Sequence, residues 1–115
     1  MDQRVKEVIN LMKGDLSRRL TPGALARKVN LSPAHLRYLF KAETGATLAQ
    51  YLKTLRMEEA RRLLEATFLN VKEIMARIGA SDESHFLRDF KRTYGLTPAQ
   101  YRERHRGRAG GKESG

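Results

Sequence analysis

Hydrophobic residues recur along most of the chain at intervals of three or four positions. In the first segment, for example, Val5, Val8, Ile9 and Met12 fall on one face of a helix. There is no sustained two-residue alternation of the kind that indicates a strand. The pattern predicts an all-α fold of about seven helices, over residues 3–13, 21–29, 32–44, 47–66, 70–78, 81–94 and 97–106.

Local start and stop signals support these helices. All three prolines directly follow a hydroxyl residue, as Thr21-Pro22, Ser32-Pro33 and Thr97-Pro98. This is the pairing of an N-cap side chain with proline at the first helical position, where the missing N–H costs nothing. Further N-caps are expected at Thr47, Asn70 and Ser81, and helix ends at Gly14, Gly45 and Gly95.

Two segments of the chain read as copies of each other, fifty residues apart. The two copies run Leu36-Arg37-Tyr38-Leu39-Phe40-Lys41 and Phe86-Leu87-Arg88-Asp89-Phe90-Lys91, and are followed by Gly45, Thr47, Tyr51 and by Gly95, Thr97, Tyr101. In each copy a short helix precedes a tight turn and a longer helix, and the second turn is one residue longer. Small residues are needed where the two helices cross, and Ala26 and Ala76 are the candidates. This arrangement predicts a helix-turn-helix geometry, in which the second helix lies in the major groove of DNA.

The predicted elements divide the chain into four parts. Residues 3–46 form a first helix-turn-helix subdomain, 47–66 a long connecting helix, and 67–106 a second helix-turn-helix subdomain. The first and last helices are expected to cap the hydrophobic cores of the two subdomains. Residues 107–115 are rich in glycine and lack apolar periodicity, so we expect a disordered tail.

The chain is strongly basic. Its 115 residues include 23 Lys and Arg against 13 Asp and Glu, for a net charge of +10 and an isoelectric point near 10.4. The excess is shared evenly, with 9 basic against 4 acidic residues in 1–50 and 14 against 9 in 51–115. Such a charge predicts binding to a polyanion, most often nucleic acid, although a merely solvated basic surface is the alternative.

Several classes of chemistry find no support in the residues. Without cysteine the chain has neither disulfides nor thiolate metal sites, which fits a reducing cytoplasm. No apolar run approaches the length of a membrane span and the N-terminus is polar, so neither a membrane partner nor a signal peptide is expected. Neither His35 nor His85 has metal ligands at a recognisable spacing, so no cofactor or metal is expected. An enzyme is not expected either, because no motif pairs a nucleophile with a base.

The outward faces of the two longer helices, 32–44 and 81–94, carry a mixture of side chains suited to reading bases. Arginine can fork onto guanine O6 and N7, Tyr and Leu can contact thymine methyl groups, Glu can accept from cytosine N4, and Ser can bond either way. Arg37 and Arg88 are the first choices. The full set of expected base contacts is Ala34, His35, Arg37, Tyr38, Glu83, Ser84, His85, Leu87 and Arg88. As alternatives, the two histidines pack against the turn, and Glu83 serves only the helix dipole.

A second set of residues is expected to contact the DNA backbone. Helix N-termini offer free N–H groups to phosphate oxygens, and basic side chains add charge. The expected phosphate contacts are Thr21, Lys41, Thr47, Gln50, Lys91, Arg92, Thr97 and Gln100. The alternatives are that the threonines only cap their helices and that Lys41 and Lys91 are merely solvated.

The residues also resemble a known family, over about residues 3–106. In the second copy the matching residues are Ile74, Ile78-Gly79, Asp82, Ser84-His85-Phe86, Arg88, Phe90-Lys91, Gly95, Thr97-Pro98 and Tyr101-Arg102. In the first copy and the connecting helix they are Ala26, Leu31-Ser32, Leu36, Phe40-Lys41, Gly45, Tyr51, Arg56, Ala60 and Leu63-Leu64. Together they resemble the DNA-binding domain of the AraC/XylS family of bacterial transcription regulators. Ala80 departs from the pattern, because the family usually has a large aromatic residue there.

This resemblance implies a monomeric unit whose connecting helix holds two recognition helices in successive major-groove segments, ~34 Å apart. It implies double-stranded DNA and RNA polymerase as partners, and a place in the bacterial cytoplasm on the nucleoid. An effector-binding or dimerisation domain would lie elsewhere. The chain is then either a small stand-alone activator or, as we expect, the C-terminal domain of a longer regulator. A basic helical protein-interaction module is the alternative function.

Overall fold

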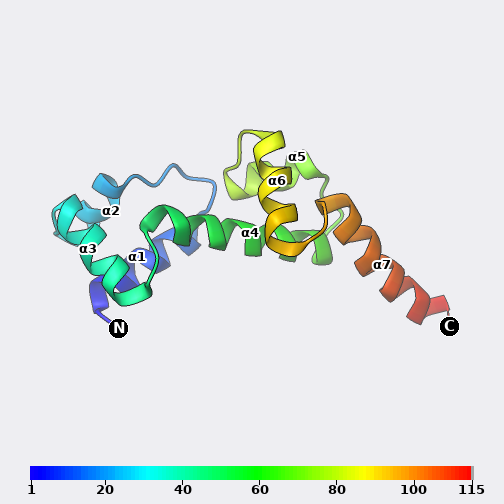
Figure 1. Ribbon diagram of the computed structural model, residues 1–115, viewed down its shortest axis with the longest axis horizontal. Coiled ribbons are helices and arrows are strands. Elements are labelled where there is room, and N and C mark those ends of the chain that lie inside the picture. Colours follow the sequence, from blue (N-terminus) through cyan, green and yellow to red (C-terminus); the bar gives the residue numbers. More distant parts are fainter. Residues whose placement is uncertain (115) are drawn as a thin grey trace. The chain divides into compact units, whose positions relative to one another are not determined.

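The residues that the structure describes fold into seven helices, as the periodicity predicts (Figure 1). The computed structural model describes residues 1–106 completely and residues 107–114 only as part of the last helix. The helices are α1 (Gln3–Gly14), α2 (Pro22–Lys28), α3 (Pro33–Thr44), α4 (Leu48–Ala66), α5 (Val71–Ile78), α6 (Glu83–Tyr94) and α7 (Pro98–Ser114). The described residues include no strand, and the all-α prediction is confirmed. The disorder expected of residues 107–115 lies outside the fully described residues and stays a prediction.

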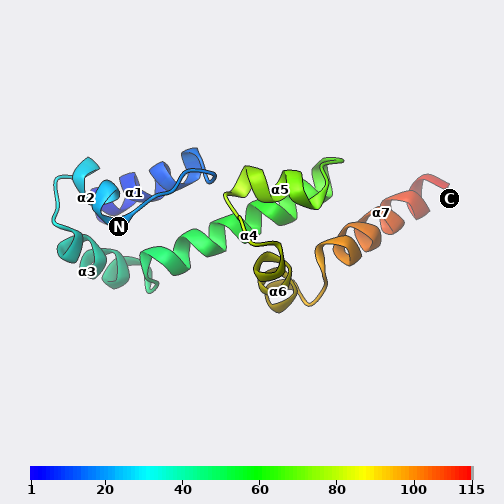
Figure 2. The same cartoon turned by 90° about the horizontal axis from the view of Figure 1, so that it is seen from above.

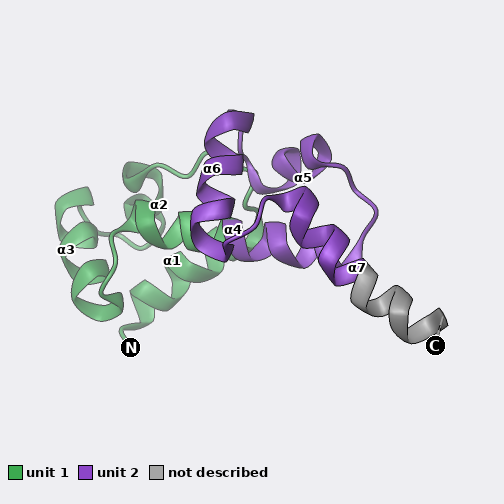
Figure 3. Ribbon diagram, turned by 45° about the vertical axis from the view of Figure 1, so that its right-hand side comes forward, with its two compact units in different colours: residues 1–56 green, residues 57–115 purple. Residues whose placement is uncertain are grey.

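The chain forms two compact units, Met1–Arg56 and Met57–Gly115 (Figure 3). The boundary falls inside α4, so the helix expected as a connector does more than connect. Its first half supplies Leu48 and Leu52 to the core of the first unit. Its second half supplies core residues to the second unit. Among the described residues, no helix combines the length and apolar character that a membrane crossing requires.

The core of the first unit is built where α1, α2 and α3 pack against one another (Figure 2). Phe40 of α3 is completely buried, and its ring meets that of Tyr51 edge to face at 5.3 Å. The remaining buried side chains come from all four helices: Val5, Val8, Ile9, Met12, Leu25, Ala26, Val29, Leu36, Leu48 and Leu52. Each large apolar side chain buried in this way contributes about 1.5–3 kcal/mol, so this core can hold the unit together.

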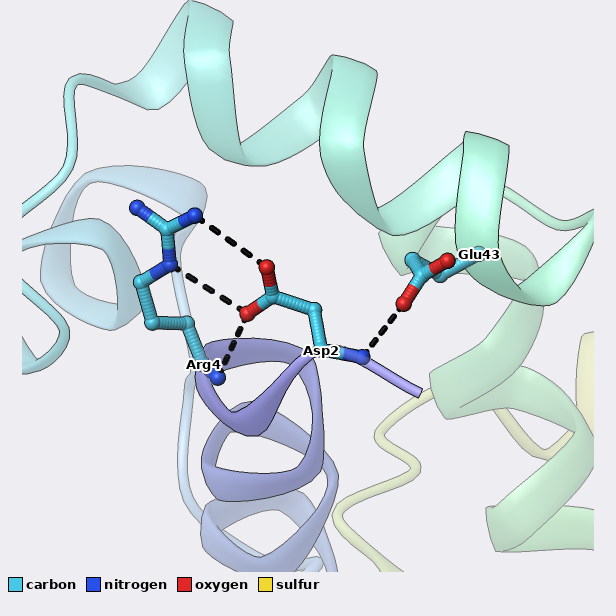
Figure 4. A network of polar contacts seen from close by, with 3 residues as sticks. All are labelled: Asp2, Arg4 and Glu43. Carbon is cyan, nitrogen blue, oxygen red and sulfur yellow. Dashed lines mark hydrogen bonds and ion pairs between the residues drawn. The ribbon is translucent and has the colours of Figure 1, made fainter.

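The first turn of α1 is fastened to α3 by polar contacts at the surface (Figure 4). The Asp2 carboxylate caps α1 by accepting from the Arg4 N–H at 2.8 Å, and it also pairs with the Arg4 guanidinium at 3.1 Å. These hydrogen bonds from Arg4 hold the pKa of Asp2 below its ordinary value. The backbone N–H of Asp2 in turn donates to the Glu43 carboxylate of α3.

The second unit has its own core, formed by the end of α4 with α5 and α6. Its buried residues are Met57, Ala60, Leu63, Leu64, Ile74, Met75, Ile78, Phe86 and Phe90. Phe90 lies at the centre of an aromatic cluster, with ring centroids 4.8 Å from Tyr94 and 5.7 Å from Tyr101 of α7. Through Tyr101, α7 is packed onto the core of its unit.

Most of the predicted helix signals are present, with one correction. Thr21, Ser32 and Asn70 are N-caps, as predicted. The N-cap of α6 is Asp82, however, and not Ser81, because Asp82 Oδ1 accepts the first-turn N–H of His85 at 2.9 Å. Gly14 is the last residue of α1, so the helix ends there as predicted, and the chain leaves α1 at Asp15.

Both helix-turn-helix turns contain one residue in the left-handed conformation. It is Asn30 (φ 58°) in the first turn and Gly79 (φ 78°) in the second. The next residue in each case donates its N–H to a carbonyl five positions back, that of Ala26 or Met75, at 2.9 Å. The turns therefore close in the same way. Ala80, at the position that departs from the family pattern, is half-buried against the second core.

The residue at the helix crossing differs between the units. Ala26 is buried, as predicted for the first crossing. Ala76 is exposed, so its assignment to the second crossing is wrong. The residue equivalent to Ala26 is the buried Met75, since each accepts the N–H that closes its turn. The extra residue of the second turn comes after Met75, so the correspondence between the two copies changes by one position there.

Candidate nucleic-acid interface

The second helix of each helix-turn-helix, α3 or α6, buries one face and exposes the other. Leu36 and Phe40 of α3 are buried, and so are Phe86 and Phe90 of α6. Eight of the nine expected base contacts are exposed on the opposite faces: Ala34, His35, Arg37, Tyr38, Glu83, Ser84, His85 and Arg88. Leu87 differs, because it is half-buried and packs against the second core.

Three of the residues expected to read bases have no polar or ring partner in the described part of the chain. Among the described residues, the side chains of Arg37, Tyr38 and Arg88 make no hydrogen bond, ion pair or ring contact. The guanidinium groups of Arg56 and Arg102, by contrast, are occupied by backbone carbonyls. The donors of Arg37 and Arg88 are therefore available to an external acceptor such as a base edge.

The two histidines occupy the same place in the first turns of α3 and α6. The backbone N–H of His35 donates to Ser32 Oγ at 3.1 Å, and that of His85 donates to Asp82 Oδ1 at 2.9 Å. Both side chains are exposed and not packed into the turn. His85 Nε2 lies 3.6 Å from an oxygen of Asp89, a distance that suits an ion pair when the imidazole is protonated but exceeds a hydrogen bond.

The expected phosphate contacts at the starts of helices are also helix caps. Thr47 and Gln50 exchange hydrogen bonds at the start of α4, and Thr97 and Gln100 do the same at the start of α7. Thr21 caps α2 by accepting the N–H of the third helical residue at 3.1 Å. Capping uses the hydroxyl oxygen as an acceptor and leaves its hydrogen free. A threonine that caps can therefore still donate to a phosphate oxygen.

The basic candidates lie at the other ends of the recognition helices. Lys41 is in the last turn of α3, and Lys91 and Arg92 are in the last turn of α6. All three side chains are exposed. A positive charge there is also favourable to the helix dipole, so this placement suits both a phosphate contact and a solvated residue.

The sequence does not reveal the structural role of Arg56 and Arg102, two arginines that belong to the family pattern. The Arg56 guanidinium donates to the carbonyls of Leu16 and Arg18, at 3.1–3.3 Å. The Arg102 guanidinium donates to the backbone after α4, including the Thr67 carbonyl at 3.1 Å. Burial lowers the pKa of both arginines from the ordinary value. Their hydrogen bonds hold the loops that precede α2 and α5, and so stabilise the two helix-turn-helix elements.

The chain matches known proteins over most of its length. A family model described as a helix-turn-helix domain matches residues 25–104. The transcriptional activator RhaR of Enterobacter sp. (strain 638) is 35% identical over 100 residues, which are 87% of this chain and 36% of RhaR. The chain spans about a third or less of the length of such curated relatives.

Two solved structures share its fold. The DNA-binding domain of AdpA, in complex with a target DNA, is 29% identical with a TM-score of 0.86, covering 93% of this chain and 96% of that one. An AraC-type transcriptional regulator from Chromobacterium violaceum is 27% identical with a TM-score of 0.82, covering 89% and 91%. With the family model matched across both helix-turn-helix units, the chain belongs to the AraC/XylS family, as one of its helix-turn-helix domains.

Proposed function

We propose that this chain binds double-stranded DNA at specific sequences and thereby regulates transcription. Its recognition helices are α3 and α6, which enter successive segments of the major groove. One observation carries the proposal: two equivalent helix-turn-helix units each present an exposed face of side chains suited to reading bases, and Arg37 and Arg88 on these faces have no partner among the described residues. The AdpA domain, which has the same fold, is known in complex with DNA.

Arg37 and Arg88 supply most of the direct base reading. A guanidinium presents its donors in a planar fork that matches guanine O6 and N7. The positive charge of the chain supplies affinity that is independent of sequence, through Lys41, Lys91 and Arg92 and the capped helix N-termini.

The experiment begins with selection from random duplex DNA, which returns both half-sites and their spacing. Affinity for the selected site should fall steeply with salt, because each phosphate contact releases counterions. Arg37→Ala and Arg88→Ala should each weaken binding to it by ~1–3 kcal/mol. Arg104→Ala is the matched control, since Arg104 is exposed on α7 outside both recognition helices. A flat salt response, or variants that bind as tightly as the parent, would contradict the proposal.

Two further partners follow from the family and not from any contact described above. The DNA-bound chain contacts RNA polymerase, and an effector-binding or dimerisation domain completes the regulator in the bacterial cytoplasm, at the nucleoid. Transcription in vitro from a promoter carrying the selected site, with and without the chain, tests the first of these. An unchanged transcript level at saturating occupancy would contradict it.

A further inference from the structure

We infer that the two half-sites of the DNA differ at one equivalent base pair, with a thymine facing Tyr38 and a guanine facing Arg88. The inference rests on the proposed function, because it assigns bases to the recognition helices. It concerns the sixth residue of each helix, the position at which an exposed aromatic residue in one unit replaces an exposed arginine in the other.

The sixth residues of α3 and α6 are structurally equivalent. Both helices have 12 residues, and both are capped by a side chain that accepts the N–H of the third residue. Both bury their fourth and eighth residues and end at a left-handed glycine, Gly45 (φ 79°) or Gly95 (φ 80°). Tyr38 and Arg88 therefore lie at the same position along their helices and on the same face. Two helices that dock in the same way would present them to equivalent base pairs.

Tyr38 is unusual among the tyrosines of this protein. It is 75% exposed, and among the described residues its hydroxyl makes no hydrogen bond and its ring stacks on no other ring. The other three tyrosines, Tyr51, Tyr94 and Tyr101, all pack onto a core. An exposed ring on a recognition helix offers an apolar surface to the groove. The C5-methyl of thymine is the apolar group that the four bases display in the major groove, so thymine is the base that this ring favours.

Arg88 offers the opposite chemistry at the equivalent position. It is exposed and has no partner among the residues that the structure describes, and its forked donors match the two acceptors of guanine. The fifth positions strengthen the contrast. In α6 this residue is Leu87, which is half-buried against the core, so Arg88 is the only arginine in the first two turns. In α3 it is the exposed Arg37, which places an arginine contact beside the thymine facing Tyr38.

The test uses base analogues that change one atom or group at a time in the selected duplex. Each thymine of the first half-site is replaced in turn by deoxyuridine, which lacks only the methyl group. Each guanine of the second is replaced by 7-deazaguanine, which lacks the N7 acceptor. We expect one uracil to weaken binding about fourfold, the effect of losing one buried methyl. One deazaguanine should weaken it about tenfold.

Protein variants identify the residue behind each effect. The uracil penalty should vanish in Tyr38→Ala but remain in Tyr38→Phe, which keeps the ring and removes the hydroxyl. The deazaguanine penalty should vanish in Arg88→Ala. In the exchanged variant, Tyr38→Arg with Arg88→Tyr, the preferred bases should exchange between the half-sites. Both side chains are exposed, and the melting temperature of each variant verifies that it is folded.

Each unfavourable outcome has a separate meaning. If no uracil weakens binding, or if the penalty persists in Tyr38→Ala, the inference is overturned while the proposed function stands. If Tyr38→Phe loses affinity equally for thymine and uracil, the hydroxyl contacts phosphate and the inference is again overturned. If selection returns no preferred sequence at all, the proposed function itself fails.

Discussion

The Thr47 hydroxyl accepts a hydrogen bond from the Gln50 N–H at 3.1 Å, and Gln50 Oε1 accepts one from the Thr47 N–H at 3.0 Å. Thr97 and Gln100 repeat this arrangement at 3.2 and 3.0 Å. Each pair is a capping box, which satisfies two of the N–H groups that a helix start leaves open. The same residues are candidates for phosphate contact, and suitable substitutions separate the two roles.

The substitution Gln50→Glu should preserve stability and weaken DNA binding. Glutamate accepts the Thr47 N–H as glutamine does, so the free energy of unfolding should change by less than about 0.5 kcal/mol. Its carboxylate would stand beside the DNA backbone, and we expect affinity to fall about tenfold or more. Urea unfolding and DNA titration measure the two effects. Unchanged affinity would show that Gln50 only caps α4.

Alanine at the two left-handed helix ends should destabilise the protein. Gly45 and Gly95 have φ values of 79° and 80°, and a Cβ added at either would meet no atom within 4 Å. The whole cost is therefore backbone strain, about 1–2 kcal/mol for each substitution. Gly23→Ala is the matched control. This glycine lies in α2 without a left-handed φ, so alanine there should stabilise the protein by about 0.4–1 kcal/mol. Equal effects at all three sites would refute the explanation.

The substitution Arg102→Lys should destabilise the second unit although it keeps the charge. One ammonium group cannot reproduce the guanidinium contacts to the carbonyls of Leu64 at 3.2 Å and Thr67 at 3.1 Å. We expect a loss of about 1.5–3 kcal/mol in the free energy of unfolding. The measurement is urea unfolding, with the exposed Arg104→Lys as the comparison that should show no change.

One ion pair on α4 should make a small contribution to stability that depends on pH. The Arg62 guanidinium donates to both oxygens of Glu59, at 2.6 and 2.8 Å, and these bonds hold the pKa of Glu59 below its ordinary value of 4.5. The contribution is thus fully present above about pH 4.5 and is lost as the pH falls through the lowered pKa. The arginine is largely exposed to solvent, so the contribution should be small.

NMR titration of the Glu59 carboxyl group checks this pH dependence directly. In Arg62→Ala the pKa should return toward its ordinary value. A titration that is the same in both proteins would show that Arg62 does not cause the shift.

Much of the fold was predictable because its signals are local. A hydroxyl or amide residue before a helix and a glycine after it act through neighbouring backbone groups, and they placed most helix boundaries within a residue or two. The one cap error arose where two neighbouring residues can both serve as a cap. Ser81 and Asp82 can each cap a helix, and only the course of the turn decides between them.

Apart from Leu87, which is half-buried, the exposed faces of α3 and α6 were also predictable, because the spacing of Phe40 and Phe90 fixes which side faces the core. The error at Ala76 has a different origin. The sequence shows that the second turn is one residue longer, but it does not show where the extra residue is inserted. The roles of Arg56 and Arg102 depend on carbonyls more than thirty positions away in sequence, which no local pattern reveals.

Each unit keeps its own core, and the residues expected to read bases contribute almost nothing to either of them. This separation bears on how such a regulator evolves. Substitutions at Glu83, Ser84 or Arg88 leave the packing of both units intact, so one half of a binding site can change while the other is retained. A population can then explore new promoters through viable intermediates, each still anchored by the older half of its site.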